Sequence, residues 1–225
     1  AHVTATRGIK TALDEGDLQF GDMGFWLGLD VKLSSLAQGT SCIPVPISAR
    51  LDLFKAPVLP EVAEEISEAV ARLANDIRDN YDIVIADTGQ FWSGLTGELL
   101  CNSSLVLIVM DQRRASAYGA IKALELCQRL GIPMARIAFV LNRASGMSHS
   151  EIERIESSLG CEELFRLADG KTTIEALVGM GRIEELVEEG AAPIPDIELL
   201  LTKLLPRTGI EFPAIERKKT RRFFT

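Results

Sequence analysis

The stretch YDIVIADTGQFWSG, residues 81–94, decides the fold that this sequence predicts. Its first part, Tyr81–Ala86, is a short apolar run rich in β-branched residues, a pattern typical of a strand buried on both faces of a sheet. The run leads into Asp87, Thr88 and Gly89. Open α/β sheets bind ligands at such strand ends, where a carboxylate can hold the water shell of Mg²⁺ and a glycine lets the backbone approach a phosphate. The stretch therefore predicts either a ligand-binding strand end or an ordinary strand that ends in an aspartate-containing turn.

Apolar strand-like runs alternate with helical patterns along the chain, which predicts an α/β fold with a doubly wound, mostly parallel sheet and helices on both faces. Residues 31–50 are expected to form a loop, because Pro44 and Pro46 interrupt any regular element. We expect one domain over residues 1–205 and a basic tail over 206–225. The expected strands are 10–13, 51–55, 81–86, 104–110, 137–141 and 163–167, and the expected helices are 60–80, 95–100, 115–130, 148–159, 172–180, 182–189 and 195–205.

Composition narrows the class of protein. The chain has 225 residues, of which 47% are hydrophobic, so it can form a substantial core. A net charge of −8 argues against a general nucleic-acid surface, and we expect no specific nucleic-acid partner. The four cysteines are widely spaced and form no CxxC pair, which favours reduced thiols in a cytoplasmic protein over a disulfide framework or a zinc site. No signal peptide and no bilayer-spanning apolar run is recognisable.

Three polar residues follow predicted strands, namely Asp17, Asp87 and Asn142. The carboxyl ends of parallel strands lie along one edge of the sheet, so the three side chains can converge on one ligand. Two carboxylates suit a magnesium ion and an attacking water, and an asparagine can pair with the edge of an adenine. Each residue alone is also an ordinary turn former. Together the three predict a nucleotide site.

Several ordered blocks of the sequence resemble the MinD/ParA class of deviant-Walker ATPases, and within it the CpaE/TadZ-type pilus-assembly proteins. The resemblance covers roughly residues 9–190, and agreement of several ordered blocks is far more specific than any single one. YDIVIADTG resembles the Walker B strand and switch II, and DLQFGDMGFWLGL resembles switch I and its sequel. The other blocks are LDLFKAPVLPEVAE (51–64), LVLIVMDQRRASAYGAIKALELCQRLGI (105–132) and FVLNR (139–143).

This resemblance implies a P-loop NTPase-like fold that uses ATP and Mg²⁺. Asp17 would correspond to the switch I aspartate that polarises the attacking water, and Asp87 to the Walker B aspartate near the metal. Glu15 stands where the family has the first of two switch I acids, which implies a second carboxylate near Mg²⁺. The residues that would contact the nucleotide are Asn142, Arg143 and Asp169.

The chain departs from the family pattern at the phosphate-binding loop, which the family places between a first strand and a helix, ahead of the segment that starts this chain. GIKT at residues 8–11 enters a predicted strand, and GKTT at 170–173 has Phe165 where the loop spacing needs glycine. Two interpretations follow. The loop belongs to a preceding part of the parent protein, which the helix-like start at residues 1–8 favours, or the chain is a non-hydrolysing relative.

The resemblance therefore implies an ATP-dependent positional switch that forms a nucleotide-dependent homodimer and places a Tad/Flp-type pilus-assembly machine at a cell pole. Two alternatives stay open. One is a nucleotide-independent localisation scaffold with a degenerate ATPase fold, and the other is a positioning ATPase for the septum, the flagellum or the chromosome. The expected location is the cytoplasm, at a pole or at the inner face of the membrane.

The end of the chain reverses the overall charge. Its cations and aromatic residues would suit a peripheral contact with an anionic membrane or with a protein partner, and the alternative is a solvated tail. We expect Trp26 to pack in the core and Trp92 to contact a partner. The candidate contact residues of the tail are Arg217, Lys218, Lys219, Arg221, Arg222, Phe223 and Phe224.

Overall fold

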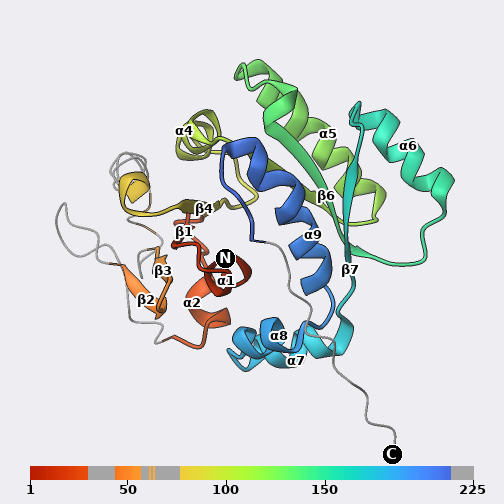
Figure 1. The fold of residues 1–225 in the computed structure, drawn as a ribbon. Helices are drawn as coiled ribbons and strands as arrows, with labels where there is room; N and C mark the ends of the chain where they lie inside the picture. Colours follow the sequence, from red (N-terminus) through yellow and green to blue (C-terminus); the bar gives the residue numbers. More distant parts are fainter. Residues whose placement is uncertain (30–43, 57–60, 62, 64–76, 214–225) are drawn as a thin grey trace, which may run out of the picture.

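Strands and helices alternate in the computed structural model, which describes residues 1–29, 44–56, 61, 63 and 77–213 (Figure 1). Two sheets have the strand orders β2-β3-β1-β4 and β5-β6-β7. All paired strands are parallel except β2 and β3. The strands are β1 (Thr11–Glu15), β2 (Val45–Ser48), β3 (Leu51–Phe54), β4 (Ile83–Asp87), β5 (Val106–Met110), β6 (Ile137–Ala144) and β7 (Leu164–Ala168).

Helices cover both faces of the second sheet, as Figure 1 shows for α5 and α6 on one side and α9 on the other. The predicted α/β architecture is therefore confirmed. Within the described part of the chain, no helix has the length and apolarity needed to cross a membrane. The helices are α1 (His2–Thr6), α2 (Met23–Trp26), α4 (Gly94–Asn102), α5 (Arg114–Arg129), α6 (His149–Leu159), α7 (Lys171–Gly179), α8 (Ile183–Glu189) and α9 (Ile194–Leu204), with short 3₁₀ turns at Arg78–Asn80, Met134–Arg136 and Leu205–Thr208.

The strand expected at residues 137–141 is β6, which lies at the centre of its sheet. Its five residues Ile137–Leu141 are all buried, since β5 and β7 flank it and helices pack on both faces. The helix that follows it, α6, begins with the predicted capping box. The Ser148 side chain accepts from the Glu151 N–H, the Glu151 carboxylate accepts from the Ser148 N–H, and Gly160 ends the helix in the left-handed conformation.

One expectation in the first half of the chain needs correction, and another lies mostly outside the described residues. Residues 45–48, expected to be loop, form strand β2 despite Pro46. Pro46 is tolerated because β2 is an outer strand of its sheet, and its pairing with β3 shifts register between Pro46 and Ser48. The expected helix 60–80 falls mostly outside the described residues.

Strands β4 and β5 are each the terminal strand of their sheet. Among the described residues, β4 pairs with β1 and β5 pairs with β6, and neither has a second strand neighbour. The helix between them, α4, connects the two sheets, because Leu99 packs beside β4 while Leu100 packs in the core under β5. On β5, Leu107 and Val109 are 44% and 58% exposed. A strand of a doubly wound sheet is normally buried on both faces, so β5 is incompletely covered.

A close backbone contact joins α2 to the turn between α7 and α8. A Cβ atom on Gly181 would lie 2.8 Å from the Gly28 Cα, closer than side chains approach a backbone. Both glycines also have positive φ angles, +67° at Gly28 and +69° at Gly181. Only glycine fits this geometry at low cost, since a side chain would be strained at either position.

Candidate functional site

The two predicted catalytic residues lie at the ends of neighbouring strands, since Asp17 is in the loop after β1 and Asp87 is the last residue of β4. The last residues of β1 and β4, Glu15 and Asp87, are directly paired in the parallel register. Beyond the strand ends, the Gly16 N–H donates to the Asp87 carbonyl at 2.8 Å. A Cβ atom on Gly89 would lie 2.6 Å from Asp17 Oδ2, so the two loops touch, and a side chain at position 89 would displace the Asp17 carboxylate. The structure therefore brings Asp17 and the loop after Asp87 together.

Asp17 also organises its own loop. Its Oδ1 accepts hydrogen bonds from the Gln19 N–H at 3.3 Å and from the Phe20 N–H at 3.0 Å, the pattern of an aspartate that closes a turn onto its own backbone. Oδ2 lies against Gly89 instead. One oxygen of Asp17 thus fixes the loop, and the other is directed toward the neighbouring loop.

Negative charge is concentrated at this strand end. Partial burial, followed by the carboxylates of Asp22, Asp17 and Glu15, raises the pKa of Asp87 above its usual value. Each of these carboxylates makes it harder to ionise Asp87, and a bound cation would relieve the repulsion. The charge pattern therefore suits a positively charged ligand or metal ion.

Glu15, expected near Mg²⁺, has a structural role that the sequence did not reveal. Its side chain is buried, with Oε1 accepting from the Met23 N–H at 2.7 Å and Oε2 accepting from the Ala56 N–H at 2.8 Å. It therefore ties the start of α2 and the end of the β3 region to β1. As a metal ligand Glu15 stays a prediction. In residues 1–29, 44–56, 61, 63 and 77–213, no group of three histidine, cysteine or acidic side chains is arranged to hold a metal.

We expect Glu15→Ala to lower the free energy of unfolding by about 2–4 kcal/mol, since two backbone N–H groups lose a charged acceptor. Urea unfolding followed by circular dichroism measures this loss. Glu15→Gln is the matched control, because its amide oxygen can still accept one of the two hydrogen bonds. An alanine variant as stable as the glutamine variant would contradict this structural role.

A cavity of about 530 Å³ opens between the loops that follow β1 and β4 and the first turn of α4. It includes Asp17 but neither Asp87 nor Asn142 among its described lining residues. The described lining residues are Gly16, Asp17, Leu18, Gln19, Phe20, Ala63, Gly89, Gln90, Phe91, Ser93, Gly94, Leu95 and Thr96.

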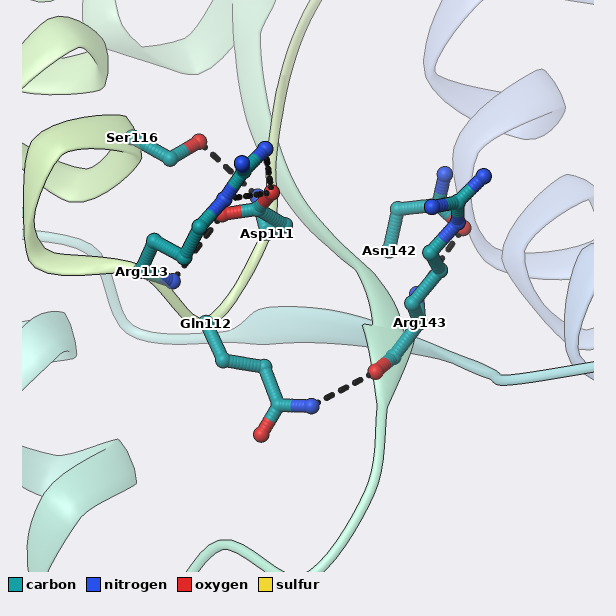
Figure 2. A network of polar contacts seen from close by, with 6 residues as sticks. All are labelled: Asp111, Gln112, Arg113, Ser116, Asn142 and Arg143. Atoms are coloured by element: carbon teal, nitrogen blue, oxygen red, sulfur yellow. Dashed lines mark hydrogen bonds and ion pairs between the residues drawn. The ribbon is translucent and has the colours of Figure 1, made fainter.

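Asn142 and Arg143 lie on the second sheet, at the end of β6. Figure 2 shows that Gln112, just beyond β5, reaches across and donates from Nε2 to the Arg143 carbonyl at 2.8 Å. The Asn142 side chain accepts from the Arg143 N–H at 2.9 Å and is half-buried rather than sealed in the core. Arg143 has a φ angle of +54°, which is uncommon for a residue other than glycine. Backbone outliers of this kind concentrate at functional sites.

The loops that follow β5 and β7 are each held by an aspartate within the same loop. Beyond β5, the Asp111 carboxylate accepts from the Arg113 backbone N–H at 2.9 Å and pairs with its guanidinium (Figure 2). These hydrogen bonds from Arg113 lower the pKa of Asp111. Beyond β7, Asp169 Oδ1 accepts from the Lys171 N–H at 3.0 Å. Convergence of Asn142 and Asp169 with Asp17 on one nucleotide stays a prediction.

Trp26 is more exposed than expected, and contact of Trp92 with a partner stays a prediction. Trp26 on α2 is 38% exposed and stacks edge-on against Phe25, with ring centroids 5.1 Å apart. Trp92 is half-buried and packs against the core of the second sheet. Glycine and serine neighbours suggested an exposed Trp92, but the loop turns its indole inward. The tail residues proposed as membrane or partner contacts lie outside the described residues.

Asp14 is a buried acid that the sequence analysis passed over. It lies on β1 between Phe54 and Ala86 of the flanking strands, is 3% exposed, and its Oδ2 has no hydrogen-bond partner among the described residues. Burial, and secondarily the Glu15 carboxylate, raise the pKa of Asp14 to about 6. The expected strand ended at Leu13, one residue before Asp14, so the sequence analysis did not place this acid inside a strand.

No protein-family model and no curated protein sequence matches this chain. Solved structures do. A ParA family ATPase from Chlorobium tepidum TLS is 21% identical, covers 90% of this chain and 91% of its own, and has a TM-score of 0.73. A Cyanothece McdA variant in complex with ATP is 13% identical, with 95% and 91% coverage and a TM-score of 0.71. MinD in the Aquifex aeolicus MinC:MinD complex is 16% identical, with 95% and 89% coverage and a TM-score of 0.64. The chain thus has the fold of the ParA/MinD ATPases.

Proposed function

We propose that this chain is the core of an ATP-dependent positional switch that places a Tad/Flp-type pilus-assembly machine. The observation that carries the proposal is the meeting of Asp17 with the loop after Asp87 at the carboxyl edge of two parallel strands. Ligands of open α/β sheets bind at this edge. The fold shared with ParA, McdA and MinD supports a nucleotide as the ligand.

The chemistry assigned to the site is hydrolysis of the terminal phosphate. Mg²⁺, when bound, would neutralise charge on the phosphates, and Asp87 would hold its water shell. Asp17 would orient the attacking water through Oδ2, since its Oδ1 is engaged by the loop backbone. Asn142, Arg143 and Asp169 would contact the base and ribose from the second sheet.

In the part of the chain that the structure describes, β4 and β5 each have one edge without a strand partner, which supports a further strand between them. Both strands are apolar, and Leu107 and Val109 of β5 are partly exposed. We propose that one further strand lies between β4 and β5 and carries the phosphate-binding loop at its carboxyl end. Such a strand would pair with both edges and place backbone N–H groups beside Asp17 and Asp87.

The partners proposed are a second copy of the chain, in a dimer that nucleotide favours, and a pilus-assembly or polar protein. A solved structure of the same fold is a MinC:MinD complex, which supports a partner-binding role. Location at a pole or at the inner membrane face would depend on the tail cations Arg217, Lys218, Lys219, Arg221 and Arg222 and on the adjoining Phe223 and Phe224.

The experiment is calorimetric titration of the full-length protein with ATP in the presence and absence of Mg²⁺, with phosphate release measured in parallel. We expect Mg²⁺-dependent binding tighter than about 1 mM and slow turnover. GTP is the control nucleotide, because an adenine contact at Asn142 would reject it. No binding at millimolar ATP would end the proposal.

A localisation scaffold of the same fold is the second candidate. The observation that favours it is that none of the described residues lining the cavity beside Asp17 is a lysine or arginine, the side chains that stabilise transferring phosphates. A scaffold would hold its partner equally well after Asp17→Ala and Asp87→Ala. Loss of partner localisation in either variant, with unchanged protein levels, would favour the ATPase.

A further inference from the structure

The end of β6 is irregular at the two residues that we expect to contact a nucleotide. The pairing of β5 with β6 ends at Met110 and Leu141, and the pairing of β6 with β7 shifts register between Leu141 and Ala144. Asn142 and Arg143 fall in this interval, and neither has a paired residue on β5 or β7. Irregularities of this kind re-aim side chains and are frequent next to active sites. Contacts other than strand pairing must therefore hold these two residues.

Gln112 supplies such a contact from the loop after β5. Its Nε2 donates to the Arg143 carbonyl at 2.8 Å, as Figure 2 shows, and to Ser145 Oγ at 3.3 Å. Only the NH2 end of an amide can donate to a carbonyl, so the orientation of the Gln112 amide is fixed by chemistry. Gln112 therefore crosses from one strand end to the next, beyond the last residue pair of the regular ladder.

The Arg143 backbone is held on both sides of its Cα. Its carbonyl accepts from Gln112, and its N–H donates to Asn142 Oδ1 at 2.9 Å. The φ angle of Arg143 is +54°, a conformation that residues other than glycine keep only when their surroundings support it. If the carbonyl were released, rotation within Arg143 would move its N–H, and the Asn142 amide would lose its anchor.

The Asn142 amide keeps polar atoms for a ligand. Oδ1 accepts one hydrogen bond from Arg143 and has a second lone pair, while no residue in the described part of the chain accepts from Nδ2. Figure 2 shows the side chains of Asn142 and Arg143 directed away from Gln112. Gln112 contacts the backbone of this segment and not these side chains, so any effect that it has on a ligand passes through them.

We propose that Gln112 is a positioning residue for base recognition, which holds the Arg143 carbonyl and so aims the Asn142 amide at the edge of an adenine. A fixed amide separates adenine from guanine, because the 6-amino group of adenine donates to Oδ1 whereas the 6-carbonyl of guanine would face it. The consequence for nucleotide choice rests on the proposed function. The holding of Asn142 by Gln112 does not.

The holding of Asn142 is measured on the full-length protein without nucleotide. Gln112→Met keeps an unbranched side chain of similar length and removes the donor. The sequence has four asparagines, so selective ¹⁵N labelling of asparagine gives a simple spectrum in which Asn142→Asp identifies the side chain of interest. We expect the order parameter of Asn142 Nδ2 to fall to about 0.6 or lower in Gln112→Met. Gln128→Met, at an exposed position on α5, is the matched control. An order parameter that Gln112→Met leaves unchanged overturns the proposal.

Base preference is measured as the ratio of the Kd values of Mg²⁺–GTP and Mg²⁺–ATP. The ratio should fall about tenfold in Gln112→Met and change less than about twofold in Gln128→Met. Adding Arg143→Gly to Gln112→Met should restore about half or more of the lost preference on a logarithmic scale, because glycine adopts a positive φ angle without support. Loss of the Arg143 side chain weakens both nucleotides, so it cancels in the ratio. A double variant that recovers nothing would show that Gln112 does not act through the Arg143 backbone, contrary to the proposal.

The two measurements separate this inference from the proposed function. If the unaltered protein binds neither nucleotide, the proposed function fails, and the order parameter alone decides whether Gln112 holds Asn142. If both nucleotides bind and the Asn142 amide becomes mobile in Gln112→Met without a change in the ratio, Asn142 is not the base reader and Gln112 has no role in recognition. That result would leave ATP binding itself intact.

Discussion

Asp17→Asn is expected to reduce ATP turnover by the full-length protein by about 10²–10³-fold while leaving Mg²⁺–ATP binding within a few-fold of the original value. The structure gives the reason for this separation. Asparagine retains an oxygen that can accept from the Gln19 and Phe20 N–H groups, so the loop keeps its shape. What is lost is the negative charge of the oxygen that lies against Gly89, which would orient and polarise the water. Single-turnover phosphate release measures the effect.

Asp22→Asn is the matched control for this experiment. Asp22 belongs to the same acidic group and contributes most among the neighbouring carboxylates to the raised pKa of Asp87, yet it has no assigned chemical step. We expect its loss to change turnover only a few-fold. Asp87→Asn should differ from both by weakening the Mg²⁺ dependence of ATP binding. Equal turnover in the Asp17 and Asp22 variants would remove Asp17 from the mechanism.

Asp14→Asn is expected to stabilise the protein at neutral pH. The ordinary pKa of this carboxyl is 3.8, whereas burial raises the pKa of Asp14 to about 6 in the folded chain. The folded state therefore binds the proton more tightly than the unfolded state, and stability falls as the pH rises between these two values. The difference corresponds to roughly 3 kcal/mol that ionised Asp14 costs above pH 6. Asparagine carries no such cost.

The measurement is the free energy of unfolding of both proteins from pH 4 to pH 7.5 by urea denaturation. The advantage of Asp14→Asn should be below about 1 kcal/mol at pH 4 and approach roughly 3 kcal/mol at pH 7. Asp79→Asn, at an exposed position in the turn before β4, controls for the change in net charge. A constant difference across the whole range would show that titration of Asp14 is not its cause.

Periodicity and strand composition were sufficient to predict the α/β fold. The runs that became β4, β5 and β6 are apolar, and of these β6 is enclosed by strands on both edges and helices on both faces, the environment that leaves such a pattern. Strand β2 was missed because its pairing is antiparallel and at the outer edge, where Pro46 is compatible with a strand. Helix α2 has four residues, too few to establish a helical period.

Residue types predicted the candidate site less completely than the fold. Asp17 and Asp87 were identifiable because acids that follow apolar strands are distinctive, and their loops do meet. The role of Glu15 could not be read in advance, since its two backbone partners are 8 and 41 residues away along the chain. The environment of Trp92 likewise depends on how one loop folds over the second sheet, which no local pattern encodes.

The glycine pair at positions 28 and 181 places the segment after α2 in direct contact with the turn between α7 and α8. Because their backbones are in contact, α2 cannot shift toward the α7–α8 turn without pushing it. A fluorophore attached at the exposed Met180, after its replacement by cysteine, would therefore report from a distance when the loop ahead of α2 rearranges.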